Sequence, residues 1–206
     1  DSRLNFGGVD CNNQRLIGLN VTGNNLSNLN VSAFDELIEL KSSNNNIYDL
    51  DVRSNRKMEG VESNGTHLSR LDLSQNRDLK VLAINDNRFS NQGDLDLSQN
   101  WNLERFELRN NNLHSVNISQ NRNLKILYAS NNQLDALDVT QHAYLLEIDC
   151  SNNRLSSLNP SMSYDLHTLY CNDNLLAQLD LKNNKKLENL SILNNEALLR
   201  TSGSVK

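Results

Sequence analysis

Four histidines and three cysteines are the side chains of this 206-residue chain most suited to catalysis or metal binding. They are His67, His114, His142 and His167, with Cys11, Cys150 and Cys171. Nucleophilic catalysis needs a base beside the nucleophile, and a protein metal site needs several ligands at matching spacing. No Cys/His, Ser/His/Asp or metal-ligand spacing joins these residues, and no glycine-rich phosphate loop is present. The sequence therefore predicts no enzyme, no catalytic residue, no metal and no cofactor.

Recurring aspartates raise the separate possibility of calcium binding. They stand in the segments Asp72-Leu-Ser74, Asp96-Leu-Ser98, Asp138-Val-Thr140 and Asp180-Leu-Lys182, and the equivalent residues Asn30, Asn117 and Asn159 interrupt the series. One carboxylate at intervals of about 5 Å does not supply the six to eight oxygens that calcium prefers. We expect instead a column of turns in which each Asp or Asn side chain accepts a nearby backbone hydrogen bond.

The elements that position these residues follow from a repeat of about 21 residues. Its first positions are Leu16, Leu37, Met58, Leu79, Leu103, Leu124, Leu145, Leu166 and Leu187. Apolar residues return at the fourth, sixth, eleventh, fourteenth and sixteenth positions, with Asn at the ninth. Side chains of a strand alternate between faces, so positions four and six point inward from a short strand. Stacked copies then form a parallel sheet in which each coil buries the next.

The pattern Leu-x-x-Leu-x-(Leu, Cys or Ala)-x-x-Asn-x-Leu resembles the leucine-rich repeat and runs from about Leu16 to Asn195. Segments such as Cys150-Ser-Asn-Asn-Arg-Leu-Ser-Ser-Leu158 are similar to the short repeats of internalin-J-like bacterial surface proteins. The resemblance implies an α/β solenoid, a leucine-rich repeat arc with its parallel β-sheet on the concave face. So short a coil leaves room only for 3₁₀ or extended turns on the convex side.

Three segments follow from this interpretation. Residues 1–15 form an amino-terminal cap, because Phe6-Gly-Gly-Val-Asp-Cys11 resembles the Trp-x-Gly-Val-x-Cys entry segment of many leucine-rich proteins. Residues 16–195 form the solenoid of about nine coils. Residues 196–206 contain no full repeat and no evident closing helix, so we expect the natural polypeptide to continue beyond Lys206.

The ninth-position column is predicted to be structural. It contains Asn24, Asn45, Asn87, Asn111, Asn132, Asn153, Asn174 and Asn195. Buried amides need hydrogen-bond partners, so we expect these side chains to bond the backbone of the adjacent coil. Thr66 interrupts the column, and the same coil contains Gly60 and Asn64-Gly65, which are costly to order in a strand. The third coil is therefore predicted to be the loosest.

The exposed face of the sheet is the remaining candidate for function. The predicted ligand-binding residues on this concave face are Arg105, Glu107, Arg109, Tyr128, Glu147, Asp149, Thr168 and Tyr170. Tyr128 and Tyr170 lie two coils apart, with arginines on one side and carboxylates on the other. Tyr and Arg are enriched in interface hot spots. The alternative is a solvated sheet face whose two aromatic residues merely suit a strand.

Composition and charge narrow the partners. A net charge of −5 and a pI near 5.4 disfavour nucleic acid, and no apolar run is long enough to span a membrane. Together with the resemblance, this predicts a monomeric, secreted or cell-surface recognition or adhesion module that binds a protein or a glycan on its concave face. One alternative is an intracellular scaffold that positions a catalytic domain, and another is a purely structural spacer. The sequence does not identify the partner.

Overall fold

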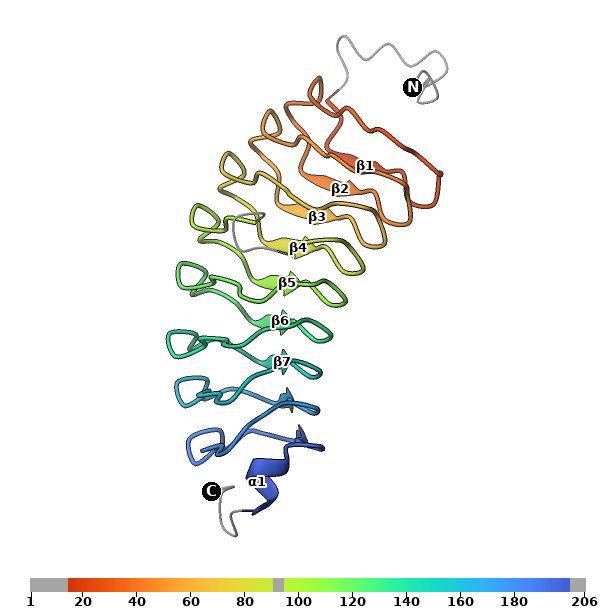
Figure 1. Cartoon of the computed structure of the whole chain (residues 1–206). Helices are drawn as coiled ribbons and strands as arrows, with labels where there is room; N and C mark the ends of the chain where they lie inside the picture. The colour runs from red at the N-terminus through yellow and green to blue at the C-terminus, as the bar shows by residue number, and fades with distance from the viewer. Residues whose placement is uncertain (1–14, 91–94, 201–206) are drawn as a thin grey trace.

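The computed structural model describes residues 15–90 and 95–200, and these residues form a gently curved stack of coils (Figure 1). Each coil contributes one three-residue strand to a single parallel sheet of order β1-β2-β3-β4-β5-β6-β7-β8-β9. The strands are β1 (Gly18–Asn20), β2 (Glu39–Lys41), β3 (Gly60–Glu62), β4 (Val81–Ala83), β5 (Arg105–Glu107), β6 (Ile126–Tyr128), β7 (Glu147–Asp149), β8 (Thr168–Tyr170) and β9 (Asn189–Ser191). This confirms the predicted parallel solenoid.

The middle residue of each strand from β1 to β8 is buried in the core, whereas Leu190 of β9 is exposed. Leu40, Val61, Phe106 and Leu127 are fully buried, and the register places each beside its counterpart in the next coil. The two outer residues of a strand point to the opposite, open face because side chains alternate along a strand. The core is therefore one continuous column of apolar side chains, and a single coil could not bury its own set.

A residue with positive φ ends the strand segment of each coil at the eighth position. The residues are Gly23, Asn44, Gly65, Asp86, Asn110, Asn131, Asn152, Asp173 and Asn194. Only glycine, and to a lesser extent Asn and Asp, adopts this left-handed conformation without strain. Gly65, with φ of 58°, is thus suited to its place. The cost of ordering a glycine in a strand therefore does not apply to Gly65, which lies in a turn, although Gly60 does lie in β3. The looseness of the third coil stays a prediction.

Turns, and not helices, form the outer side of each coil. In the third coil, the amide of Asn76 bonds the Leu73 carbonyl at 3.0 Å and the amide of Leu79 bonds the Asn76 carbonyl at 3.2 Å. Before these turns, the Asp72 carboxylate accepts the Ser74 amide at 3.0 Å. Asn30, Asp96, Asn117 and Asp138 accept the amide two residues ahead in the same way. The predicted column of side-chain-capped turns is confirmed.

One short helix, α1 (Glu196–Arg200), closes the described part of the stack. The sequence analysis expected no closing helix here, because residues 196–206 show no evident amphipathic pattern. The structure buries Leu198, whose amide bonds the Asn195 carbonyl at 3.1 Å. No helix of the described residues is long and apolar enough to cross a membrane. The predicted cap lies outside the described residues, except for Arg15.

Candidate functional site

The open face of the sheet carries a continuous row of the predicted residues. The strand register places Glu107 beside Tyr128, Tyr128 beside Asp149, and Asp149 beside Tyr170. Arg109 follows β5 by two residues and reaches the same face. We call Arg105, Glu107, Arg109 and Tyr128 the central cluster.

Glu107 holds the two arginines of the central cluster. Its carboxylate is 2.5 Å from the Arg105 guanidinium and 3.3 Å from Arg109 Nη1. It also accepts Asn85 Nδ2 at 2.9 Å. Glu107 is only 9% exposed, so these three donors supply the partners that a buried carboxylate needs. The sequence analysis missed Asn85, which stands at the seventh position of the preceding coil.

Tyr128 lies between the arginines and the carboxylates of β7. The Arg109 guanidinium carbon is 3.8 Å from the centre of the Tyr128 ring, and that of Arg105 is 5.5 Å away. Such cation–π contacts stabilise by about 0.5–1 kcal/mol at exposed sites and more when desolvated. The Tyr128 hydroxyl donates to the Glu147 carboxylate. Burial, and then this hydrogen bond, raise the pKa of Tyr128, so the phenol keeps its proton.

Asp149 continues the network on β7. Its Oδ2 accepts the Ser130 hydroxyl at 2.8 Å and lies 3.5 Å from Arg109 Nε. Its Oδ1 accepts a hydrogen bond from the backbone amide of Ser151, two residues further along the chain, at 3.2 Å. The structure thus brings six of the eight predicted residues into one paired network, from Arg105 on β5 to Asp149 on β7.

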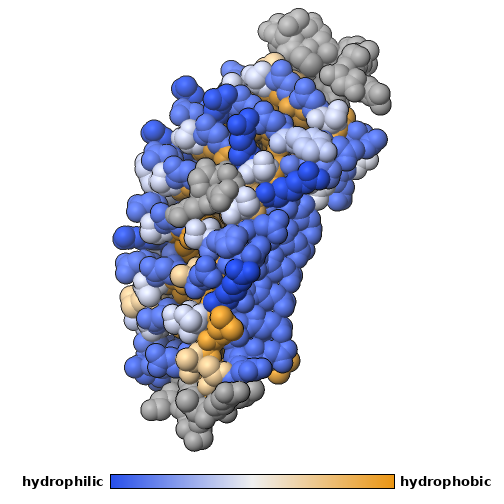
Figure 2. Space-filling model, viewed as in Figure 1, coloured by the Kyte–Doolittle hydropathy of each residue, from blue (hydrophilic) through white to orange (hydrophobic). Residues whose placement is uncertain are grey.

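The other two predicted residues, Thr168 and Tyr170, stand apart on β8. Thr168 Oγ1 accepts Asn189 Nδ2 at 3.3 Å. Tyr170 is 39% exposed, and the register places Ser191 of β9 beside it. Leu193, which follows β9 by two residues at the seventh position of its coil, is 67% exposed. Figure 2 shows a largely hydrophilic surface with several apolar areas, one of them near the carboxyl-terminal end. We call Thr168, Tyr170 and Leu193 the carboxyl-terminal patch. The sequence analysis missed Leu193, although its seventh position in the ninth coil marks this face.

The ninth-position asparagines form what we call the inner column. Seven of them accept a backbone amide of the preceding coil with Oδ1 and donate to its backbone with Nδ2; they are Asn45, Asn87, Asn111, Asn132, Asn153, Asn174 and Asn195. Asn24 differs from the expectation. It is exposed and its side chain donates only to the Thr22 carbonyl, because no earlier coil stands beside it among the described residues.

A second column, which the sequence analysis missed, lies between the two outer turns of each coil. This outer column lies three residues before the first residue of the next coil and contains Asn55, Asn76, Asn100, Asn121, His142, Ser163 and Asn184. Each of these side chains bonds the backbone of the preceding coil; Asn121 Nδ2, for example, donates to the Leu97 and Asn100 carbonyls at 3.1 and 2.8 Å. The available signal was an Asn recurring three residues before each repeat's leading Leu.

Among the described residues, the histidines and cysteines are not gathered into one site. His142 is buried in the outer column, whereas the remaining histidines lie at other positions of other coils. Cys150 and Cys171 are free and fully buried at the same position of adjacent coils. Burial raises the pKa of Cys171 to about 12 and that of Cys150 well above its usual value, so neither thiol forms a nucleophilic thiolate. Within the described ranges, no cluster of His, Cys, Asp and Glu could hold a metal ion.

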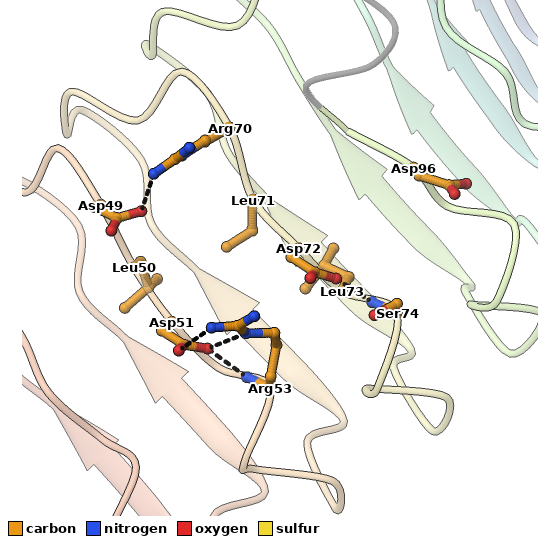
Figure 3. A pocket seen from close by; sticks show the side chains of 10 residues that line it. All are labelled: Asp49, Leu50, Asp51, Arg53, Arg70, Leu71, Asp72, Leu73, Ser74 and Asp96. Carbon is orange, nitrogen blue, oxygen red and sulfur yellow. Dashed lines mark hydrogen bonds and ion pairs between the residues drawn. The ribbon is translucent and has the colours of Figure 1, made fainter.

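One hollow of about 460 Å³ lies on the flank of the second to fourth coils (Figure 3). Arg53 donates to both carboxylate oxygens of Asp51 at 2.9 and 2.8 Å, which lowers the pKa of Asp51 to about 2. Arg70 lies 3.7 Å from Asp49, and Asp72 caps its own turn. The charged groups in the hollow are therefore largely paired with one another, which leaves little to bind a ligand.

Comparison with known proteins supports the fold. No family model and no curated sequence matches the chain. Among solved structures, the functional domain of InlJ from Listeria monocytogenes, which includes a cysteine ladder, is 26% identical over 88% of this chain and 49% of its own, with a TM-score of 0.54. Internalin C2 from the same organism is 20% identical, with a TM-score of 0.80, over 85% of this chain and 80% of its own.

A third match has a protein partner in its structure. It comes from an octameric complex of latrophilin 3, Unc5D and the leucine-rich repeat part of FLRT2, with 20% identity and a TM-score of 0.61. The match covers 88% of this chain and 58% of that one. The present chain thus spans about half the length of InlJ's functional domain and somewhat more of the chain in this complex.

Proposed function

We propose that this chain, a leucine-rich repeat protein with an internalin-like fold, binds another protein through the open face of its sheet and catalyses no reaction. The observation that carries the proposal is the row of tyrosines, arginines and carboxylates that the register aligns across β5 to β8. A solenoid offers an extended surface in place of a deep cavity, and Tyr and Arg are the residues that most often dominate binding energy.

The network on this face favours recognition over a purely structural spacer. A spacer would need only solvated polar side chains on the face, whereas here Glu107 is buried among donors and Tyr128 is covered by a guanidinium. Such pairing fixes side-chain rotamers before a partner arrives, which lowers the entropy lost on binding. A glycan could use the same flat aromatic surface, but the alternation of charges over β5 to β7 fits a protein partner better.

The setting that best fits this function is a secreted or cell-surface protein, in which the chain acts as a recognition or adhesion module. The support is the likeness to the internalins. The alternative is an intracellular scaffold that restrains a catalytic domain elsewhere in the same polypeptide. Fractionation of cells that express the full-length gene separates the two: recovery at the surface or in the medium supports adhesion, and retention in the cytosol with an appended enzyme supports the scaffold.

The binding face is tested with alanine variants of an immobilised chain. Tyr170→Ala and Arg109→Ala are compared with Tyr164→Ala, a tyrosine of similar exposure on an outer turn. We expect the first two to weaken capture of a recovered partner by tenfold or more, as hot-spot losses of about 2 kcal/mol do. Thermal melting of each variant shows whether it is folded. If folded Tyr170 and Arg109 variants bind as the Tyr164 variant does, the face is not the binding site.

A further inference from the structure

The central cluster shows how this face holds a cation. Arg109 places its guanidinium 3.8 Å from the centre of the Tyr128 ring. The Nε atom of the same guanidinium lies 3.5 Å from the carboxylate of Asp149, which is on β7, the strand after that of Tyr128. An aromatic ring and a carboxylate of an adjacent coil thus share one positive charge, an arrangement that is stronger than either contact alone where water is partly excluded.

Tyr170 occupies the same strand position two coils later, without a cation and with a carboxylate on one side only. Asp149 lies beside it on the preceding strand, as Glu107 lies beside Tyr128, whereas Ser191 lies beside it on the following strand. Arg109 belongs to the coil before Tyr128 and is three coils from Tyr170. Among the described residues, the cation–π contacts fall on Tyr48 and Tyr128 only, and the Tyr170 ring remains 39% exposed.

Charge around Tyr170 is negative on the open face. The third, fifth, seventh and eighth positions of the last three coils contain Glu147, Asp149 and Asp173, and neither Lys nor Arg. In earlier coils the same positions contain Lys41, Arg105 and Arg109. Leu193 adds an exposed apolar surface beside Tyr170, and Lys and Arg side chains pack their methylene stems on such surfaces.

We propose that the carboxyl-terminal patch binds an arginine or lysine side chain of the protein partner, with its cation on the Tyr170 ring and its stem against Leu193. The inference rests on the proposed function and specifies the chemistry of the partner. Its physical basis is charge complementarity: Asp149 lies beside Tyr170 on the preceding strand, the open face of the last three coils contains no Lys or Arg, and the chain's own arginine lies over the corresponding ring of Tyr128.

The direct test is a nuclear magnetic resonance titration with two capped peptides, Gly-Arg-Gly and Gly-citrulline-Gly, which differ in charge and scarcely in shape. We expect the arginine peptide to shift the Tyr170 ring and Leu193 methyl signals and the citrulline peptide to leave them nearly unchanged. Tyr170→Leu should weaken arginine binding about two- to fivefold, which is the size of an exposed cation–π contact. Tyr170→Phe should bind as the wild type does, because the ring and not the hydroxyl carries the contact.

Tyr164→Leu is the matched control, since Tyr164 is also exposed but lies on an outer turn. Equal binding of the two peptides would overturn the inference. So would arginine binding that is absent or indifferent to Tyr170→Leu, or shifts confined to other parts of the chain. These results differ from failure of the proposed function: a protein partner that is lost with Tyr170→Ala while the arginine peptide does not bind would keep the face and exclude only the cationic occupant.

Discussion

The inner and outer columns both join each coil to the one before it, but they use different parts of their side chains. Asn153 of the inner column accepts the Leu134 amide at 3.0 Å with Oδ1 and donates to the Ala129, Cys150 and Ser151 carbonyls at 3.0–3.2 Å. Asn121 of the outer column donates to two carbonyls, whereas its Oδ1 has no partner in the described part of the chain. The Oδ1 atom is unpaired in the same way in Asn55, Asn76, Asn100 and Asn184.

This difference explains which residues each column admits. The inner column needs an acceptor and two donor hydrogens on one planar group, and among the side chains only an amide of this length supplies both. The outer column needs only a donor, so His142 serves with Nε2 and Ser163 with its hydroxyl. Phe34 stands at this position in the first coil, where no earlier coil among the described residues needs a donor.

The largest expected effect comes from removing one amide from each column. Asn153→Ala leaves the buried Leu134 amide without its acceptor, so we expect a loss of about 2–3 kcal/mol in the free energy of unfolding. The Ala129, Cys150 and Ser151 carbonyls each lose one donor but keep another. Asn121→Ala should lose only about 1 kcal/mol, because the Leu97 and Asn100 carbonyls each keep a backbone amide partner. Urea unfolding of the two variants measures the difference. Equal losses would show that the unpaired Oδ1 atoms do not mark a weaker column.

The repeat made the fold predictable from sequence. The spacing of Leu, the inward fourth and sixth positions and the inner Asn each recur in nearly every coil, so one coil predicts the next. The outer column was missed because Phe34, His142 and Ser163 interrupt it and hide the shared requirement for a donor. Gly65 was misjudged because a period does not reveal backbone conformation, and the turn at the eighth position became evident only from its positive φ.

The candidate site was predictable in position but not in pairing. Alternation along the strands places Tyr128 and Tyr170 on the open face equally well, and both have a carboxylate at the equivalent position of a neighbouring coil. What separates them is the side-chain path of Arg109, which extends over Tyr128 in the next coil and leaves Tyr170 exposed. Rotamers of long side chains depend on all their neighbours, and a repeat pattern contains no information on them.

A smaller effect is expected where the inner column is already broken. The Thr66 hydroxyl contacts the Ser63 carbonyl and Asn87 Oδ1, which lie in its own coil and the following one, whereas the asparagines reach the preceding coil. Thr66→Asn can reach the Ser42 carbonyl and the Ile47 amide of the second coil. We expect a gain of about 1 kcal/mol in stability and slower amide hydrogen exchange over residues 58–68.

The reverse substitution is the control for that gain. Asn132→Thr removes the equivalent bonds to Leu113 and Leu108 in an intact part of the column and should speed exchange there. If wild-type exchange over residues 58–68 is no faster than over residues 124–134, the third coil is not loosened by Thr66, and the inner column tolerates a residue without an amide.

The smallest effect at neutral pH concerns His142, the only titratable side chain among the described residues of the outer column. Burial, more than any other cause, lowers the pKa of His142 from its usual 6.5. Hydrogen bonds to the Ile118 and Val139 carbonyls and the charge of Asp138 act in the opposite direction, and the charge of Arg122 adds to the lowering. Below pH 6.5 the unfolded chain takes up a proton that the folded chain resists. Stability should therefore be complete above pH 6.5 and fall as the pH drops toward the lowered pKa.

His142→Asn isolates this pH dependence from that of the carboxylates. Asparagine can donate to the Ile118 carbonyl as His142 Nε2 does, and it does not titrate. We expect the variant to match the wild type at pH 7.5 and to exceed it in urea midpoint at pH 5, while the acid unfolding caused by other groups stays common to both. If the urea midpoints of the two proteins stay parallel across this range, the outer column accommodates a protonated His142. A second N–H donor on the ring is then tolerated at the place where the asparagines of the column have an unpaired oxygen.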